Sequence, residues 1–257
     1  MLNSKDKVAI YMESNLDSDY GKMGMGVIRY LSNQITCVID SNHAGKRIKS
    51  FINTDRKIPI VRSLEIAIER KSTVLVLGIA PSGGKIPKEW TPIIEKALKN
   101  GLSIVNGLHE LLFPKWKDLI KINKNQWIWD VRMPLFVPDI ATGKAGKLKN
   151  KRILFIGTDM AVGKMTAALE IYSFLNNKRK NVGFVATGQI GITLTGKGIP
   201  LDAFKVDHAC GAVETTVLEN SKKEIVLIEG QGSLLHPGST ATLPLMRGSC
   251  PTHLILC

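Results

Sequence analysis

The sequence predicts an α/β protein built from two parallel-sheet domains. Strand-like and amphipathic helix-like segments alternate through the first half of the 257 residues. A glycine-bounded loop that ends in Lys164 follows an apolar segment at the start of the second half. Between these halves, residues 134–151 contain proline, glycine and lysine without a sustained period, which is typical of a domain boundary. We therefore predict a Rossmann-like domain over residues 1–140 and a P-loop NTPase-like domain over residues 151–257.

The first half has the spacing of a parallel sheet with helical crossovers. Strands that alternate with amphipathic helices of this length pair in parallel, because each helix carries the chain back to the starting edge of the sheet. The expected strands are residues 8–12, 35–40, 73–79 and 103–107, and the expected helices are residues 21–32, 63–71 and 89–101.

The second half repeats this alternation around a long connection. After the lysine-containing loop and its helix come a strand at 182–187, a glycine-punctuated loop at 188–204, a helix at 206–220, and strands that begin near Ile225 and His253. We expect the last strand to be buried. Because no helix follows it and a parallel sheet normally has both faces covered, we expect the chain to be truncated at its C-terminus.

Composition excludes several classes of protein. Apolar residues make up 44% and charged residues 22%, as in globular proteins, and no apolar run is long enough to cross a membrane. The N-terminus lacks a secretory signal, so we expect a cytoplasmic protein with reduced cysteines. The net charge of +13 comes from lysines spread along the whole chain, without the aromatic-interleaved basic motif of a nucleic-acid-binding surface. We therefore expect a small-molecule substrate, no nucleic-acid or membrane partner, and a homo-oligomer.

Residues 153–166, ILFIGTDMAVGKMT, have the features of a phosphate-binding loop. Small residues let consecutive backbone N–H groups surround an anion, the following helix adds its positive N-terminal dipole, and Lys164 adds a full charge. Five residues separate the two glycines, one more than in the common Walker A pattern. This spacing resembles the loop of dethiobiotin synthetase and its nucleotide-dependent relatives. The expected cofactor-binding residues are Gly157, Thr158, Asp159, Ala161, Val162, Gly163, Lys164, Met165 and Thr166.

Met165 stands where such loops usually have Ser or Thr, whose hydroxyl binds magnesium. Thr166 is one position further along the helix, a rotation of about 100°, so its hydroxyl would point in another direction. The loop therefore favours holding phosphates over metal-assisted hydrolysis, and no metal site is expected. A ligand whose phosphates are held but not cleaved, such as coenzyme A, fits this loop as well as ATP does.

Two loops after strands of the second half carry the other candidate residues. Glu229 lies at the end of an apolar strand. Phosphate-loop domains usually have an acidic residue at this place, at the end of a second strand and beside the phosphates. Glu229 would therefore act as a base or hold a metal-bound water. His236 follows in the next loop as a second catalytic candidate, with the capping of local backbone as its alternative role. Gln189, in the glycine-punctuated loop, is expected to bind substrate. Asp207 and Glu214 share one helix face, which either meets the site or faces solvent.

In the first half, Arg132 is expected to bind a substrate carboxylate through its guanidinium fork. His109 is a weaker candidate in the same half, and structural roles for both residues remain open. The loop Pro81 to Lys85 follows a strand, where open α/β sheets bind ligands. Because the phosphate loop lies in the other half, we expect the acceptor substrate to bind between the two domains.

The order of motifs along the whole chain resembles a family of former unknown function that includes D-glutamate N-acetyltransferases of the DgcN type. Its most specific segments are GTDMAVGKMT and IEGQGSLLHP, supported by DVRMP, TGQIGI and GSCPTHLILC. The resemblance implies the two domains above and acetyl transfer from acetyl-CoA to the amino group of a D-amino acid. It also implies a base near that amine and backbone N–H groups that stabilise the oxyanion.

Two other functions remain open at this point. The first is an ATP-dependent ligase that activates carboxylates, as dethiobiotin synthetase does. The second is a nucleotide-sensing module without catalytic activity. Turnover of ATP with magnesium would indicate the ligase, whereas nucleotide binding without turnover would indicate the sensor.

Overall fold

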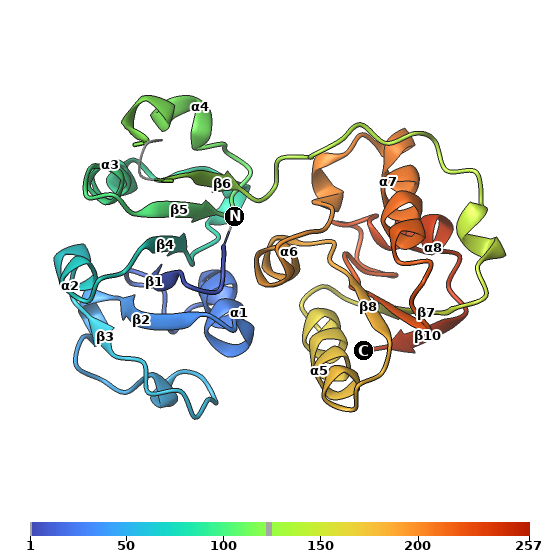
Figure 1. Ribbon diagram of the computed structural model, residues 1–257, viewed down its shortest axis with the longest axis horizontal. Coiled ribbons are helices and arrows are strands. Elements are labelled where there is room, and N and C mark those ends of the chain that lie inside the picture. Colours follow the sequence, from blue (N-terminus) through green and yellow to red (C-terminus); the bar gives the residue numbers. More distant parts are fainter. Residues whose placement is uncertain (1, 122–124) are drawn as a thin grey trace. The chain divides into compact units, whose positions relative to one another are not determined.

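The computed structural model describes residues 2–121 and 125–257. The chain forms two compact units, Met1–Arg132 and Met133–Cys257, each with its own sheet and its own apolar core (Figure 1). This architecture confirms the predicted α/β class with two parallel-sheet domains.

The first unit is a six-stranded parallel sheet in the order β3-β2-β1-β4-β5-β6. The strands β3 and β6 were missed by the sequence analysis, because two or three residues are too few to establish a pattern. The strands are β1 (Lys7–Tyr11), β2 (Gln34–Ile39), β3 (Ile60–Val61), β4 (Val74–Leu77), β5 (Ser103–Asn106) and β6 (Ile128–Asp130), and the α-helices are α1 (Lys22–Tyr30), α2 (Leu64–Glu69), α3 (Thr91–Lys99) and α4 (Phe113–Trp116).

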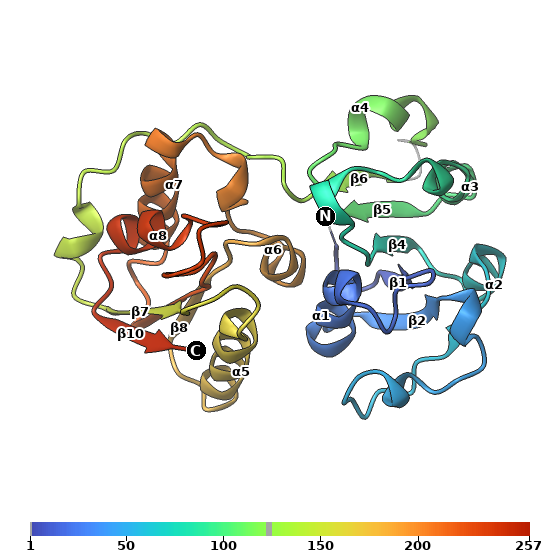
Figure 2. The same cartoon turned by 180° about the vertical axis from the view of Figure 1, so that it is seen from behind.

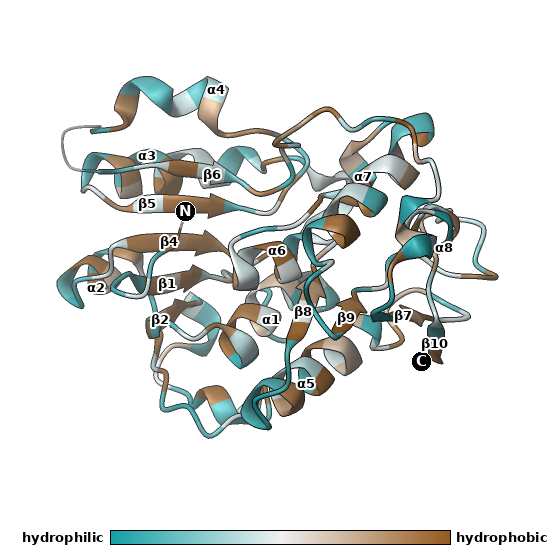
Figure 3. Cartoon of the chain, turned by 45° about the vertical axis from the view of Figure 1, so that its right-hand side comes forward, coloured by the Kyte–Doolittle hydropathy of each residue, from teal (hydrophilic) through white to brown (hydrophobic). Residues whose placement is uncertain are grey.

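The central strands β1 and β4 are buried on both faces, which explains why they are almost wholly apolar (Figure 3). Ala9 and Tyr11 of β1 belong to the core cluster that includes α2 and α3 residues such as Leu64 and Ile94. Residues between them point to the opposite face. There Ile10 lies close to Gly78, which in turn contacts the backbone of α1. The carboxyl ends of all six strands therefore share one edge between two helical layers.

The second unit is a four-stranded parallel sheet in the order β10-β7-β9-β8. The strand that leads into the phosphate loop, β7, lies between β9 and β10, so the residues after β7 and β9 are neighbours. The strands are β7 (Lys151–Ile156), β8 (Val182–Val185), β9 (Ile225–Ile228) and β10 (His253–Leu256), and the α-helices are α5 (Lys164–Asn177), α6 (Gln189–Thr195), α7 (Val206–Glu219) and α8 (Thr242–Ser249).

Helices cover both faces of the second sheet (Figure 2). Leu154 and Ile228 pack with α7 and α8 residues such as Val213 and Leu245 in one core cluster. On the other face, the Tyr172 ring of α5 lies 5.2 Å from the Phe184 ring of β8. This packing fixes the N-terminus of α5 at the carboxyl edge of the sheet, where the phosphate loop lies.

Two expectations for this unit were wrong. The connection 188–204 begins with a helix, α6, although its internal glycine, Gly191, lowers helix propensity. Gly191 is required there, because a Cβ at this position would lie 2.3 Å from the Glu229 carboxylate. The last strand, β10, is an edge strand with Leu254 47% and Leu256 63% exposed, not a buried one.

The segment after Arg132 packs on helix α7 and belongs to the second unit. Glu214 of α7 is buried and accepts backbone hydrogen bonds from Thr142 (2.8 Å) and Ala145 (3.3 Å). Burial alone would raise the pKa of Glu214, but these backbone bonds outweigh it and lower the pKa. Glu214 therefore fixes the interdomain segment in place. The sequence left two roles open for this helix face, contact with the site or exposure to solvent. Glu214 has neither role, whereas Asp207 is exposed to solvent.

Close packing of this segment on α7 depends on Gly211, and we expect Gly211→Ala to destabilise the protein. A Cβ there would lie 1.6 Å from the carbonyl oxygen of Asp139, so the segment must move away. The expected loss in the free energy of unfolding is about 1–3 kcal/mol, measured by urea denaturation. Gly146→Ala is the matched control, because its Cβ would meet nothing closer than 3.6 Å. Equal stability of the two variants would contradict the packing argument.

None of the helices in the described residues is both long enough and apolar enough to span a membrane.

Candidate functional site

The phosphate loop connects β7 to α5 and turns through left-handed backbone conformations. Gly163 has φ +102° and directly precedes the first residue of α5, while Ala161 has φ +60°. Residues 158–162 are exposed, whereas Lys164 is buried. The loop thus presents its backbone at the surface, with a single cation beneath it and a helix N-terminus behind it.

Lys164 directs its charge into the loop. Its Nζ donates a hydrogen bond of 2.7 Å to the carbonyl oxygen of Asp159. Burial lowers the pKa of Lys164, because the charged amine has lost part of its hydration. An anion in the loop would compensate this desolvated charge, so the residues present fit a phosphate group.

Gly157 and Gly230 allow the chain to pass close to this lysine. A Cβ on Gly157 would lie 3.1 Å from Lys164 Nζ and 2.6 Å from Val162. A Cβ on Gly230 would lie 1.8 Å from the Phe155 carbonyl oxygen and 2.9 Å from Lys164 Cδ. The ends of β7 and β9 therefore enclose the lysine side chain, and larger residues at these two positions would fill its space.

Glu229 lies at the end of β9, directly before Gly230, and is 2% exposed. Its Oε2 accepts hydrogen bonds from the backbone of Thr187 (2.8 Å) and Gly188 (3.2 Å). Burial raises the pKa of Glu229 to about 7, although these two bonds act in the opposite direction. A carboxyl group with this pKa exchanges its proton near neutral pH, which is the property of a general acid or base.

Helix α6 starts beside this carboxylate. Gln189 is the first residue of α6, directly after the two amides that bond to Glu229. The Gln231 side chain approaches the same turn, because a Cβ on Gly188 would lie 2.0 Å from its Nε2. The structure therefore places Gln189 near Glu229 at the carboxyl edge of the sheet. Both residues lie in segments that follow strands, where the sequence analysis expected a functional loop.

The loop after β9 is tied to the phosphate loop by backbone hydrogen bonds. Leu234 N donates to Gly157 O (2.9 Å), and Leu235 N donates to Thr158 O (3.3 Å). His236 is exposed in this loop, and its Nδ1 accepts a hydrogen bond of 3.0 Å from Gly238 N. His236 therefore caps local backbone, which was its alternative role. The catalytic role of His236 stays a prediction.

Exposed apolar side chains from these two loops surround the phosphate site. We call Met160, Val162, Leu234 and Leu235 the apolar rim. Their exposed fractions range from 40% for Val162 to 76% for Leu235. Apolar groups exposed together beside a polar site are typical of ligand-binding surfaces.

Arg132 and His109 lie together in the first unit. They line a pocket of about 250 Å³ with Pro81, Gly84 and Gly107, at the carboxyl ends of β4 and β5. Arg132 Nε donates a hydrogen bond of 2.7 Å to Gly107 O, which fixes its guanidinium group at this edge. The sequence prediction thus placed the Pro81–Lys85 loop correctly at a strand end.

Other site residues have no signal in the sequence. Thr187 and Gly188 contribute backbone amides, which any residue type supplies, and Leu234 takes part through its backbone alone. Among residues 2–121 and 125–257, the structure contains no group of three or more His, Cys, Asp or Glu side chains arranged to hold a metal ion.

Comparison with known proteins identifies both units. Residues 41–134 match the model described as "Domain of unknown function (DUF1611_N) Rossmann-like domain", and residues 139–257 match "Domain of unknown function (DUF1611_C) P-loop domain". A crystal structure of a DUF1611 family protein from Anabaena variabilis ATCC 29413 is 45% identical, with a TM-score of 0.93. That similarity covers 98% of this chain and 74% of the other.

Two curated proteins are also similar. Both are named D-glutamate N-acetyltransferase, one from Pseudoalteromonas sp and one from Tritonibacter scottomollicae, and each is 40% identical to this chain. The matches cover 71% and 76% of this chain but 55% and 59% of the relatives, so the chain spans little more than half their length. Together with the two domain matches and the 45% identity to a solved member, this similarity shows that the chain belongs to the DUF1611 family.

Proposed function

We propose that this chain is an N-acetyltransferase that moves an acetyl group from acetyl-CoA to the amino group of D-glutamate. The observation that carries this proposal is the buried Glu229, whose pKa is about 7, on the strand next to the one that leads into the phosphate loop. The names of the two curated relatives support the same reaction and acceptor.

The phosphate loop is the proposed donor site. Lys164 and the backbone of residues 157–163 would hold the donor's phosphates, and Met165 replaces the hydroxyl residue that a magnesium-dependent loop requires. Acetyl-CoA supplies an acyl group activated as a thioester. No phosphate bond has to be cleaved in this reaction, so a loop without the magnesium-binding hydroxyl is sufficient.

The apolar rim is compatible with acetyl-CoA as the ligand of this loop. The Leu234 and Leu235 backbone bonds join the loop after β9 to the phosphate loop, so the rim lies beside the phosphate site. The pantetheine arm of acetyl-CoA carries methylene and geminal methyl groups between its amide and hydroxyl groups. These apolar groups can pack against the leucine, methionine and valine side chains of the rim.

Glu229 is the proposed general base. An ammonium group does not attack a thioester, so the acceptor amine must lose a proton, and a carboxylate with a pKa near neutrality accepts it efficiently. The amides of Thr187 and Gly188 hold the carboxylate through Oε2. Gln189, beside this turn, is the proposed acceptor contact in this unit. Arg132, in the first unit, keeps its proposed role as a ligand for a substrate carboxylate. His236 remains a second candidate for proton transfer.

We expect Leu235→Ser to raise the KM for acetyl-CoA without changing the binding of pyrophosphate. Loss of one partly buried apolar contact should raise the KM about three- to tenfold, as measured by initial rates. Leu243→Ser is the matched control, because Leu243 is an exposed leucine (50%, against 76% for Leu235) that lies on α8, outside the rim. Equal effects of both substitutions, or an unchanged KM for Leu235→Ser, would remove the rim from the donor site.

The proposed function is tested by release of free thiol from acetyl-CoA across a panel of D- and L-amino acids. We expect thiol release with D-glutamate in the presence of a metal chelator, and little release with L-glutamate. Phosphate release from ATP that requires magnesium would instead indicate a carboxylate-activating ligase. Nucleotide binding with neither reaction would indicate a sensor.

A further inference from the structure

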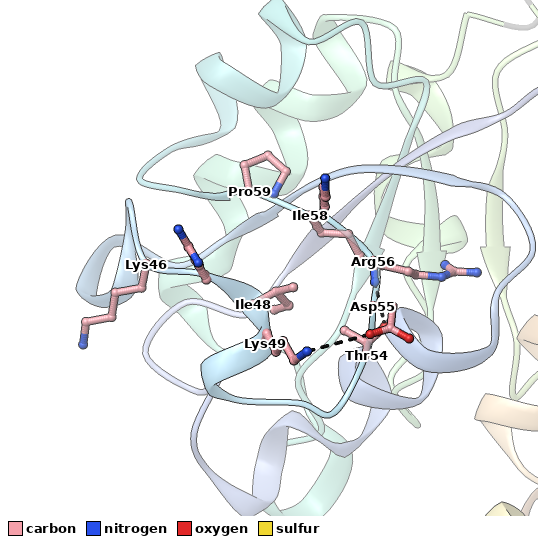
Figure 4. Close-up of a pocket in the computed structure, with 10 residues that line it drawn as sticks. Lys46, Ile48, Lys49, Thr54, Asp55, Arg56, Ile58 and Pro59 are labelled. Atoms are coloured by element: carbon pink, nitrogen blue, oxygen red, sulfur yellow. Dashed lines mark hydrogen bonds and ion pairs between the residues drawn. The ribbon is translucent and has the colours of Figure 1, made fainter.

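One pocket of the first unit lies outside the proposed site and is lined mainly by basic side chains. The segment between β2 and β3 leaves the sheet and returns to it, and we call residues 46–59 the basic loop. Gly45 N donates to Ile60 O (3.0 Å), and Arg47 forms an antiparallel bridge with Pro59, so the two ends of the loop are fastened together. The loop surrounds a pocket of about 690 Å³ (Figure 4).

Positive charge dominates the walls of this pocket. Five of its ten lining residues are cationic and one, Asp55, is acidic. The Lys49 side chain turns toward Asp55, at 3.8 Å, while Lys46 and Arg56 point away from the centre and flank it (Figure 4). The cationic lining residues are Lys46, Arg47, Lys49, Arg56 and Lys57.

Most of this charge is not neutralised by the protein. Arg56 donates to the carbonyl oxygen of Leu31, and Lys46 lies 5.9 Å from the Phe51 ring. Within the described residues, Arg47 and Lys57 have no carboxylate within ion-pair distance. Cations held close together repel one another, and a bound anion removes that repulsion.

The floor of the pocket is apolar. Ile48 and Ile58 are 2% and 6% exposed and lie between the two arms of the loop. A pocket of this volume is in the range of small-molecule sites, and an inorganic ion would leave most of it empty. The lining contains no aromatic residue, so it lacks the stacking platforms of a surface for single-stranded nucleic acid.

From this combination of volume, charge and apolar floor, we propose that the basic loop binds a phosphorylated small molecule with an apolar body, of the size of a nucleoside monophosphate. Arg47 and Lys57 hold the phosphate by charge-assisted hydrogen bonds. The apolar body lies against Ile48 and Ile58. This site is formed entirely by the first unit and does not depend on the proposed acetyl transfer.

The test uses the whole chain with Lys164→Ala, so that the phosphate loop does not contribute to binding. Adenosine monophosphate is the probe, titrated by calorimetry alongside inorganic phosphate and adenosine. We expect the Lys164→Ala chain to bind the monophosphate more tightly than either fragment. Adding Arg47→Ala and Lys57→Ala should weaken this binding at least about tenfold.

A matched pair of substitutions controls for the loss of charge. Lys88→Ala with Lys117→Ala removes two exposed lysines from the same unit and should leave binding unchanged. Circular dichroism verifies that each variant is folded. Absence of monophosphate binding by the Lys164→Ala chain, equal weakening by both pairs, binding of inorganic phosphate as tight as that of the monophosphate, or binding only of an oligonucleotide would each overturn the proposal.

Discussion

Glu229→Gln should lower kcat for acetyl transfer by roughly 10²- to 10⁴-fold, the contribution of a positioned general base. Glutamine has nearly the same shape, and its side-chain oxygen can still accept the hydrogen bonds from Thr187 and Gly188. It cannot accept the proton of the acceptor amine. The substitution therefore separates basicity from the structural contacts, and the KM for acetyl-CoA should change little. Steady-state rates with each substrate varied in turn measure both quantities.

The pH dependence provides a second measurement of the same residue. Only ionised Glu229 accepts a proton, so kcat/KM should rise with pH through an apparent pKa of about 7. The free energy of unfolding should fall over the same rise in pH. Burial raises the pKa of Glu229 in the folded state above its ordinary value of 4.5. Between pH 4.5 and about 7 the folded protein therefore holds a proton that the unfolded chain has released, so stability falls as pH rises through this range. Glu229→Gln should lack this fall.

Glu224→Gln is the matched control, because Glu224 lies directly before β9 and is exposed. It should keep the wild-type rate and the wild-type pH profile. If Glu229→Gln retained full activity, Glu229 would have only the structural role of holding the start of α6, and another group would have to be the base.

Lys164→Ala should weaken the binding of acetyl-CoA by about 2 kcal/mol or more, roughly thirtyfold in Kd. Its ammonium group is a full positive charge that the structure directs into the loop, and burial makes that charge interact more strongly with a phosphate. Calorimetric titration with acetyl-CoA measures the change. We expect the same titration of the wild-type chain to be insensitive to a metal chelator, because Met165 offers no hydroxyl for magnesium.

Lys178→Ala controls for the loss of one positive charge. Lys178 follows the last turn of α5 and is exposed, about 20 Å along the helix from the phosphate loop. Its removal should leave the Kd unchanged. An unchanged Kd in Lys164→Ala as well would exclude the loop from donor binding, and a strict magnesium requirement would favour ATP as the ligand.

The sequence was sufficient for the two domains because their signals are local. Apolar strands with helical spacing between them predict a parallel sheet, and GTDMAVGKMT predicts the loop after β7 from residue types alone. Helix α6 was not predicted, because Gly191 lowers helix propensity, and the reason for a glycine there is its close approach to Glu229. The same contact is long-range in sequence, so no window of residues contains it.

The site was predictable only where side chains carry its chemistry. Lys164 stands out by its charge at the end of a glycine-bounded loop, and Glu229 by its charge at the end of an apolar strand. Glu214 was a candidate on a helix face, and it accepts backbone hydrogen bonds from Thr142 and Ala145. Backbone hydrogen bonds lower the pKa of Glu214, whereas burial raises that of Glu229, and this difference follows from the tertiary fold.

Mass spectrometry of the product formed from acetyl-CoA and D-glutamate, with a metal chelator present, tests the proposed acetyl transfer most directly. We expect D-glutamate that carries one acetyl group on its nitrogen, in an amount equal to the free thiol released, and at least roughly 10²-fold less of this product with Glu229→Gln over the same interval. Thiol release without an acetylated amine, or product formation only when ATP and magnesium are supplied, would contradict the proposed transfer.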